Sequence, residues 1–152
     1  SSATNMIRSV AEMCDRSDIG NQIWLDVDRG FAALNDNLGS AIYLIWNEPL
    51  MVAGSDTFIA EMMKNSGFQN AVVNTRYPVL TKAEIRDLKP DFVLLSSEPF
   101  PFKSEHQKSF QSLFPESKVV LVDGEMFSWY GSRLKQAPQY FEALSKQLKD
   151  PD

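Results

Sequence analysis

The sequence has very little of the chemistry that several functional classes require. Among its 152 residues there are one cysteine, Cys14, and one histidine, His106. A single cysteine forms no intrachain disulfide, and a structural zinc site uses four nitrogen or sulfur ligands. A cysteine nucleophile needs a histidine base beside it. We expect instead that Cys14 is buried on an apolar stripe and that His106 is a solvated surface residue.

Long apolar runs and an excess of positive charge are also missing. The longest apolar run, residues 41–46, is far short of the roughly 20 residues that span a bilayer. The formal net charge of −5 and the pI of about 4.9 leave no basic face to neutralise phosphates. No GxGxxG or GxxxxGK[ST] motif occurs. Nucleic-acid binding, membrane insertion and the common nucleotide-binding motifs are therefore disfavoured.

The first part of the chain has the apolar spacing of an amphipathic helix. Ser17 is a plausible N-cap, and Gly39 is placed where a helix would end. Between them, apolar residues recur at steps of three or four: Ile19, Ile23, Val27, Phe31, Leu34 and Leu38. The spacing predicts a helical rod over residues 17–38, roughly 33 Å long. Its stripe is long for the unit that follows, which suggests a further partner, either another lobe or another chain.

After Gly39 the pattern changes to short continuous apolar runs separated by helical stretches. Runs at 41–46, 92–95 and 119–122 are apolar on both faces, as in a buried parallel sheet, and 71–74 is a weaker candidate. Helices are predicted at residues 55–66, 81–88, 104–113 and 131–148. Thr81 and Glu84 form a capping-box pattern.

We therefore predict an α/β fold with a roughly four-stranded, mainly parallel sheet flanked by helices and preceded by a long backbone helix. The predicted division is a helical segment at 1–38 and an α/β lobe at 39–152.

Aromatic and charged side chains follow the predicted strands. Ligands of open parallel sheets bind outside the carboxyl ends of the strands, so these residues are expected at one edge. The candidate ligand-binding residues are Trp46, Asn47, Arg76, Tyr77, Glu98, Phe100, Glu125, Trp129, Tyr130 and Arg133. The rings that we expect to be exposed are Trp46, Tyr77, Trp129 and Tyr130, with about half of the edge rings packed as core. Such an edge suits a large, flat, partly apolar ligand.

Two other site types remain open from the residues alone. Residues 52–55 precede a predicted helix and could bind an anion through free N–H groups, although Ser55 could equally be a plain N-cap. Glu98 and Glu125 could form an acid/base pair, but no nucleophile or histidine stands beside them in the sequence.

Three stretches, in order, carry a family resemblance. Residues 49–59 (PLMVAGSDTFI) lead from a strand through a loop to a helix. Residues 67–93 contain GFQN, then RYP, then LKPDFV, and residues 123–133 read DGEMFSWYGSR. Their order and spacing resemble the C-terminal lobe of helical-backbone metal receptors. These are the class III periplasmic substrate-binding proteins that serve cobalamin, haem and ferric-siderophore uptake.

The resemblance implies two α/β lobes joined by one long helix, here residues 17–38, with the ligand held between the lobe edges. It implies non-covalent capture of a metal chelate, with no catalysis and no resident cofactor. An N-terminal lobe and a signal peptide would lie upstream, and the location would be periplasmic or otherwise extracytoplasmic. The partner would be an ABC transporter permease, docked through a carboxylate that the spacing from Pro90 places at Ala83, with Glu84 one residue later.

Two alternatives from other classes stay open at this point. A small flavodoxin-like or reductase-type α/β enzyme would use the same strand ends and would lose turnover on changing Glu98 or Glu125. A protein-interaction module would use the aromatic edge to contact another protein and would bind no small ligand.

Overall fold

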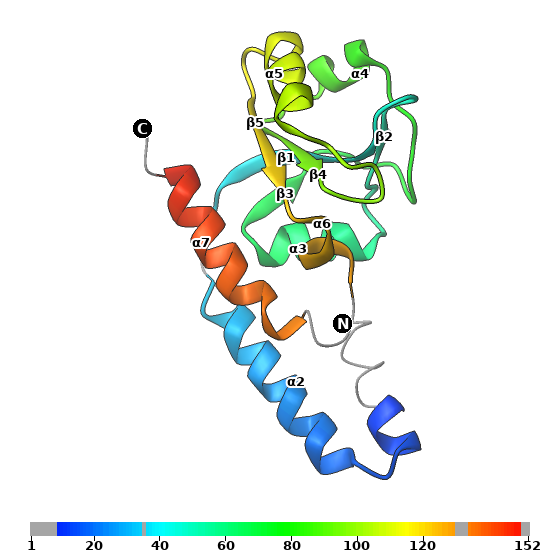
Figure 1. Ribbon diagram of the computed structural model, residues 1–152, viewed down its shortest axis with the longest axis vertical. Helices are drawn as coiled ribbons and strands as arrows, with labels where there is room; N and C mark the ends of the chain where they lie inside the picture. The colour runs from blue at the N-terminus through cyan, green and yellow to red at the C-terminus, as the bar shows by residue number, and fades with distance from the viewer. Residues whose placement is uncertain (1–8, 35, 130–133, 150–152) are drawn as a thin grey trace.

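The computed structural model describes residues 9–34, 36–129 and 134–149 (Figure 1). Its strands are β1 Gly39–Trp46, β2 Met51–Val52, β3 Phe68–Asn70, β4 Phe92–Ser96 and β5 Lys118–Val122. Its helices are α2 Ser17–Ala32, α3 Phe58–Asn65, α4 Lys82–Asp87, α5 Ser104–Leu113, α6 Gly124–Ser128 and α7 Ala137–Lys149. No helix among the described residues is both long enough and apolar enough to cross a membrane.

The sheet is mostly parallel, and β1 lies at its centre. β1 pairs in parallel with β4 through its middle, residues 41–44, and with β3 at its start, and β4 pairs in parallel with β5. At the carboxyl end of β1, the short strand β2 returns antiparallel. The predicted fold class is therefore confirmed, with five strands in the described residues in place of about four.

The weaker predicted strand, residues 71–74, is wrong. The strand in this part of the chain is β3, Phe68–Asn70, which pairs with the start of β1. At the end of β3 the Asn70 side-chain amide makes two hydrogen bonds to the backbone. That amide accepts a hydrogen bond from the Val72 N–H and donates one to the carbonyl of Ala53. Val73 is consequently 82% exposed, so the apolar run does not record a strand.

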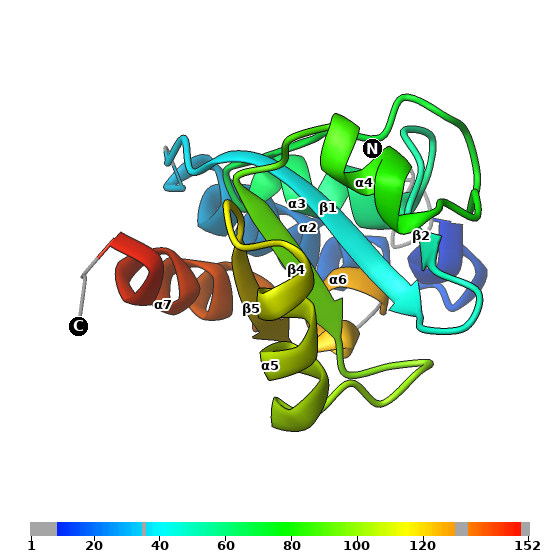
Figure 2. The same ribbon diagram turned by 90° about the horizontal axis from the view of Figure 1, so that it is seen from above.

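Helices cover both faces of the sheet (Figure 2). Because side chains alternate along a strand, Tyr43 points to one face and Leu44 to the other. One apolar cluster joins Tyr43 and Leu94 to residues of α3, α6 and α7, including Phe127 and Phe141. The other joins Leu44 to Ile85 of α4 and to Phe110 of α5, among others. These two buried layers fix the sheet on which the loops are mounted.

The predicted helical rod is shorter than the apolar spacing suggested. α2 ends at Ala32, and the segment up to Leu38 is not helical in its described residues. The Leu38 N–H donates to the carbonyl of Gly67, and the Asp36 carboxylate accepts from Lys149 and Ser145 of α7. Leu34 and Leu38 still pack on the core, so the spacing recorded burial in a non-helical connection.

α2 extends beyond the sheet, beside α7 (Figure 1). Gly30 allows their close approach, because a Cβ there would lie 2.8 Å from Pro138 Cγ. α2 carries exposed apolar residues, among them Ile19, which is 49% exposed. Cys14, just before α2, is exposed, so its predicted burial is wrong. It lies in a turn that leads into α2, where Asp15 has φ of +52°.

Two predicted helix starts also differ. α3 begins at Phe58 and is capped by Thr57, whose hydroxyl accepts from the Ala60 N–H, so Ser55 is not the N-cap. α7 begins at Ala137, and the first part of the helix predicted at 131–148 falls on residues outside the described ranges. The helix predicted at 104–113 has the predicted bounds in α5.

Candidate functional site

The last residue of β1 is a tryptophan whose indole N–H is already hydrogen-bonded. Trp46 is 40% exposed, and its Nε1–H donates to the carbonyl of Glu48 at 3.1 Å. One side of the ring packs on the half-buried Phe100, with the centroids 5.6 Å apart in an edge-on arrangement. Asn47, the next residue, is half-buried. A ligand approaching Trp46 meets the apolar surface of the indole, since its N–H is engaged.

The loop that carries Arg76 and Tyr77 is held against residues 52–55. The N–H groups of Gly54 and Ser55 donate to the carbonyls of Arg76 and Asn74 at 2.7 and 2.8 Å. Gly54 is required there, because a Cβ would lie 2.4 Å from the Asn74 carbonyl oxygen. The Asp56 carboxylate accepts from the Arg76 N–H, and Arg76 has φ of +60°.

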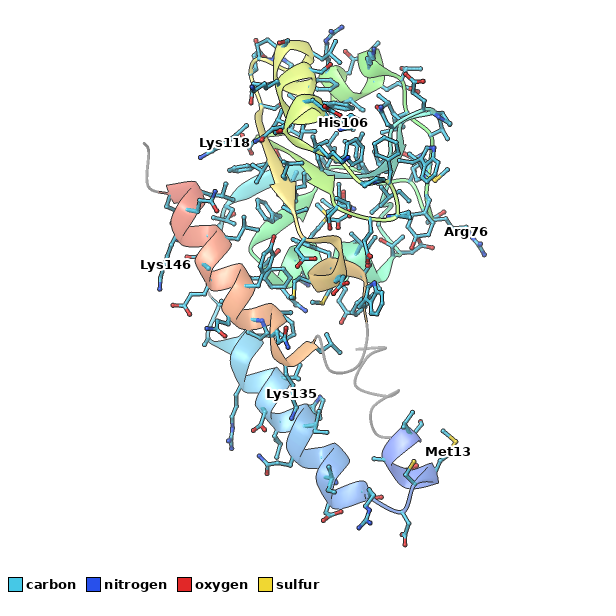
Figure 3. All side chains as sticks on the ribbon, viewed as in Figure 1. Met13, Arg76, His106, Lys118, Lys135 and Lys146 are labelled. Carbon is cyan, nitrogen blue, oxygen red and sulfur yellow. The ribbon has the colours of Figure 1, made fainter. Side chains whose placement is uncertain are left out.

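This packing leaves the side chains of Arg76 and Tyr77 on the surface. Tyr77 is 47% exposed, and Figure 3 shows Arg76 projecting away from the lobe. The N–H groups of Val52 and Ala53 also donate to backbone carbonyls, those of Pro78 and Tyr43. All four N–H groups of residues 52–55 are therefore engaged, so the anion-binding interpretation of this loop is wrong.

The loop after β4 rests on two buried hydroxyl groups. Tyr43 donates to Ser96 Oγ at 2.9 Å, and the Ser96 hydroxyl donates to the carbonyl of Glu98. Ser96 Oγ also accepts from the Glu98 N–H at 3.3 Å. Burial raises the pKa of the Tyr43 hydroxyl well above its ordinary value, so it remains a proton donor. The backbone of Glu98 is thereby fixed from below.

The Glu98 side chain is engaged as well. Its carboxylate accepts from the Trp129 Nε1–H, and the Ser128 hydroxyl, which donates to the Gly124 carbonyl at 2.7 Å, lies 3.3 Å from the same carboxylate. Trp129 follows α6 and is 50% exposed. The two loops are further joined where the Gly124 N–H donates to Ser97 Oγ at 2.9 Å. Glu98 therefore links the loop after β4 to Trp129 at the same edge of the sheet.

A hollow of about 720 Å³ lies beside this loop pair. Glu98, Asp123, Glu125 and Tyr140 are among the residues that line it. Asp123 caps α6 by accepting from the Glu125 N–H at 3.0 Å, and its own N–H donates to the Tyr140 hydroxyl. The structure thus brings Glu98 and Glu125 to one hollow, as the sequence suggested. Among the described residues, no group of three or more His, Cys, Asp or Glu side chains could hold a metal ion.

The structure sorts the predicted rings into exposed and packed sets. Trp46, Tyr77 and Trp129 are exposed as predicted, Phe100 is half-buried, and Phe102 and Phe127 are buried. Tyr130 and Arg133, also predicted for the site, lie outside the described residues.

Three supporting residues were not predicted or were assigned differently. His106 is half-buried and packs edge-on against Phe100 and Phe102, while its Nδ1 accepts from the Lys103 N–H, so its predicted solvation is wrong. Tyr43 and Ser128 were missed. A lone phenol within the aliphatic run of β1 was the available signal for Tyr43, because a buried hydroxyl needs a partner. Ser128 gave no signal of its own.

The segment proposed for transporter docking is a capped helix start. Thr81 accepts from the Glu84 N–H, while one carboxylate oxygen of Glu84 accepts from the Thr81 N–H and hydroxyl, both at 2.7 Å. These bonds hold the pKa of Glu84 below its usual value. The predicted capping box is confirmed. Ala83, where the resemblance expects the carboxylate, is exposed and carries none.

Comparison with known proteins gives structural matches alone. No family model matches the chain, and no curated protein matches it in sequence. A periplasmic haem-binding protein, BhuT in complex with two haems, has 23% identity and a TM-score of 0.76 over 97% of this chain. The periplasmic vitamin B12-binding protein BtuF of Vibrio cholerae has 11% identity and a TM-score of 0.71, also over 97%. A protein of an ABC-type Fe³⁺-hydroxamate transport system from Saccharomonospora viridis has 17% identity and a TM-score of 0.68 over 97%.

The chain spans 63%, 62% and 55% of these three structures respectively, less than two thirds of each. At identities below 25% the likeness establishes the fold. That fold is the one that the resemblance predicted, and it occurs in periplasmic haem-binding and vitamin B12-binding proteins and in a protein of an Fe³⁺-hydroxamate transport system.

Proposed function

We propose that this chain binds a metal chelate without covalent chemistry, as the C-terminal lobe of the substrate-binding component of an ABC importer. The ligand would lie on the edge formed by the loops after β1, β4 and β5 together with the loop at 74–78. The candidate chelates are haem, cobalamin and a ferric siderophore. The partner would be the transporter permease, and the location would be extracytoplasmic.

One observation carries the proposal: three exposed rings, Trp46, Tyr77 and Trp129, lie at one edge of a fold shared with chelate-binding proteins. The indole N–H groups of Trp46 and Trp129 are both bonded within the protein. Each ring therefore offers its apolar surface to a ligand, which favours stacking on a broad flat group. Arg76 adds an exposed cation at the same edge.

The same proposal assigns a role to the helical segment. α2 would be the later part of a backbone that joins two lobes, with the division near residue 38 and the second half of the ligand site on the other lobe. In support, α2 projects beyond the sheet and exposes Ile19 and, at 37%, Leu25. Docking on the permease through Glu84 receives no support, since its carboxylate is bonded to Thr81.

A fluorescence titration with haemin, cyanocobalamin and ferrichrome tests the proposal. At least one chelate is expected to quench tryptophan emission with a saturable curve. Trp129→Ala or Trp46→Ala is expected to weaken binding roughly threefold to tenfold, because each removes one aromatic contact. Trp24→Phe, on α2, is the matched control and is expected to leave the dissociation constant unchanged.

Two results would contradict the proposal. One is the absence of saturable quenching by any of the three chelates. The other is binding that Trp24→Phe weakens while Trp46→Ala and Trp129→Ala do not, since the ligand would then lie on the helical segment.

A further inference from the structure

We propose that Glu98 is a positioning residue that fixes the orientation of the exposed Trp129 ring, and that it does so without contacting the ligand. Its carboxylate accepts from the Trp129 Nε1–H, and the Ser128 hydroxyl lies 3.3 Å from it. A hydrogen bond to a charged acceptor is stronger than a neutral one, so it selects one arrangement of an exposed ring that would otherwise sample several. The sequence pattern had suggested a different role, in which Glu98 binds the ligand directly.

Glu98 is itself held firmly enough to act in this way. Ser96 Oγ accepts from its N–H and donates to its carbonyl, with Tyr43 behind Ser96. Its Cγ lies against Gly124, where an added Cβ would be 2.6 Å from that atom and 2.5 Å from Ser96 Oγ. The loop after β4 and the start of α6 are thus packed together with no room between them.

Trp129 is also tied at its backbone. Its N–H donates to the carbonyl of Glu125 at 3.0 Å, at the end of α6. The backbone is fixed at one end and the indole N–H at the other, and the residue is still 50% exposed and open to a partner. An aromatic surface ordered before binding costs less conformational entropy when the ligand arrives. Glu98 would therefore raise the affinity for the ligand by ordering the Trp129 ring before the ligand binds.

The first test uses the free protein and needs no ligand. In the full chain with Trp24→Phe and Trp46→Phe, Trp129 is the single tryptophan, and its emission is excited at a wavelength that the tyrosines do not absorb. Glu98→Leu is expected to lower the anisotropy of Trp129 and to increase its quenching by acrylamide, whereas Glu98→Gln, which keeps an acceptor oxygen, is expected to restore both. Glu105→Leu, an exposed position on α5, is the control for the same chemical change. Equal anisotropy in the parent and Glu98→Leu chains would overturn the proposal.

A second free-state measurement covers the case in which Glu98→Leu fails to fold. In the chain with all three tryptophans, Glu98→Gln removes the charge and keeps the shape. The indole N–H proton resonance of Trp129 is expected to move upfield, because its acceptor changes from a carboxylate to an amide. The resonance of Trp46, bonded to the Glu48 carbonyl, is the internal control and is expected not to move. No movement of the Trp129 resonance would overturn the assignment.

The binding consequence rests on the proposed function and is tested separately. With whichever of haemin, cyanocobalamin or ferrichrome the parent binds, Glu98→Leu is expected to weaken binding by no more than Trp129→Ala does, roughly threefold to tenfold, and Glu98→Gln by less than about twofold. If Glu98→Gln weakens binding as much as Glu98→Leu, the carboxylate contacts the ligand and the positioning role is wrong. If the parent binds none of the three, the proposed function fails, while the two free-state measurements still decide the orientation of Trp129.

Discussion

The buried hydroxyl groups of Tyr43 and Ser96 hold the loop after β4 in place. Tyr43 is fully buried and donates to Ser96, which in turn bonds both the N–H and the carbonyl of Glu98. Removing an acceptor leaves the buried donor unpaired, which costs more free energy than removing the donor itself together with its hydrogen bond. The two ends of this pair should therefore respond differently to substitution.

Tyr43→Phe is expected to lower the free energy of unfolding by about 1 kcal/mol, because it removes one neutral hydrogen bond and keeps the ring. Ser96→Ala is expected to cost about 2 kcal/mol or more, because it leaves the Tyr43 hydroxyl buried without an acceptor. Urea denaturation of both variants measures the difference. A smaller loss for Ser96→Ala than for Tyr43→Phe would contradict the observed hydrogen bonds.

Which rings are exposed could be predicted from the sequence, whereas their hydrogen-bond partners could not. Trp46 ends β1, and Trp129 follows the short helix after β5, so the apolar runs of these two strands located both rings. Tyr77 lies between β3 and α4, close to its predicted place, although the run at 71–74 from which it was located is not a strand. The pairing of Trp129 with Glu98 joins residues 31 positions apart, through the packing of Gly124 on the preceding loop. No local pattern records such a contact.

At the scale of elements, α4 shows a helix start that depends on a charged side chain. Glu84 accepts two bonds from Thr81 and is fully exposed. Since these bonds lower its pKa in the folded chain, the ionised form favours folding. The stabilisation is present above the unfolded-state pKa and is lost as the pH falls through the lower, folded-state pKa.

Glu84→Gln keeps a capping-box side chain but removes the titration. The parent is expected to be more stable than Glu84→Gln at neutral pH, and the difference is expected to shrink as the pH falls below the ordinary glutamate range. Urea unfolding of both chains at neutral and acidic pH measures this. A difference that grows on acidification would contradict the direction of the pKa shift.

The bounds of helices could be predicted from the sequence in some cases and not in others. α5 has its predicted bounds, while α2 ends at Ala32 although apolar residues continue at three- and four-residue steps to Leu38. Hydrophobic spacing reports which residues reach the core, and an extended connection can satisfy the same spacing as a helix. The contacts that hold this connection, from Gly67 and from Lys149 and Ser145 of α7, come from distant parts of the chain.

At the scale of the whole molecule, the two edges of the sheet differ in kind. At the carboxyl ends of the strands lie exposed aromatic rings and loops that are hydrogen-bonded to one another. At the opposite edge, Asp91 bonds the Ser40 backbone and hydroxyl, which lowers its pKa, and the Ser117 hydroxyl donates to the Pro90 carbonyl. A separate hollow of about 310 Å³ lies there, lined in part by Arg86 and Phe114. The opposite edge thus provides an internal control for the location of the ligand.

The most direct test of the central claim is a map of amide and indole resonances during titration with a diamagnetic chelate. Cyanocobalamin, a gallium-substituted porphyrin and a gallium hydroxamate are the three probes. This measurement detects weak binding, as expected if one lobe supplies part of a site. We predict saturable shifts at Trp46, Tyr77 and Trp129 and none at Asp91 or Ser117. Shifts centred on Asp91 and Ser117, or no saturable shift with any of the three probes, would contradict the account.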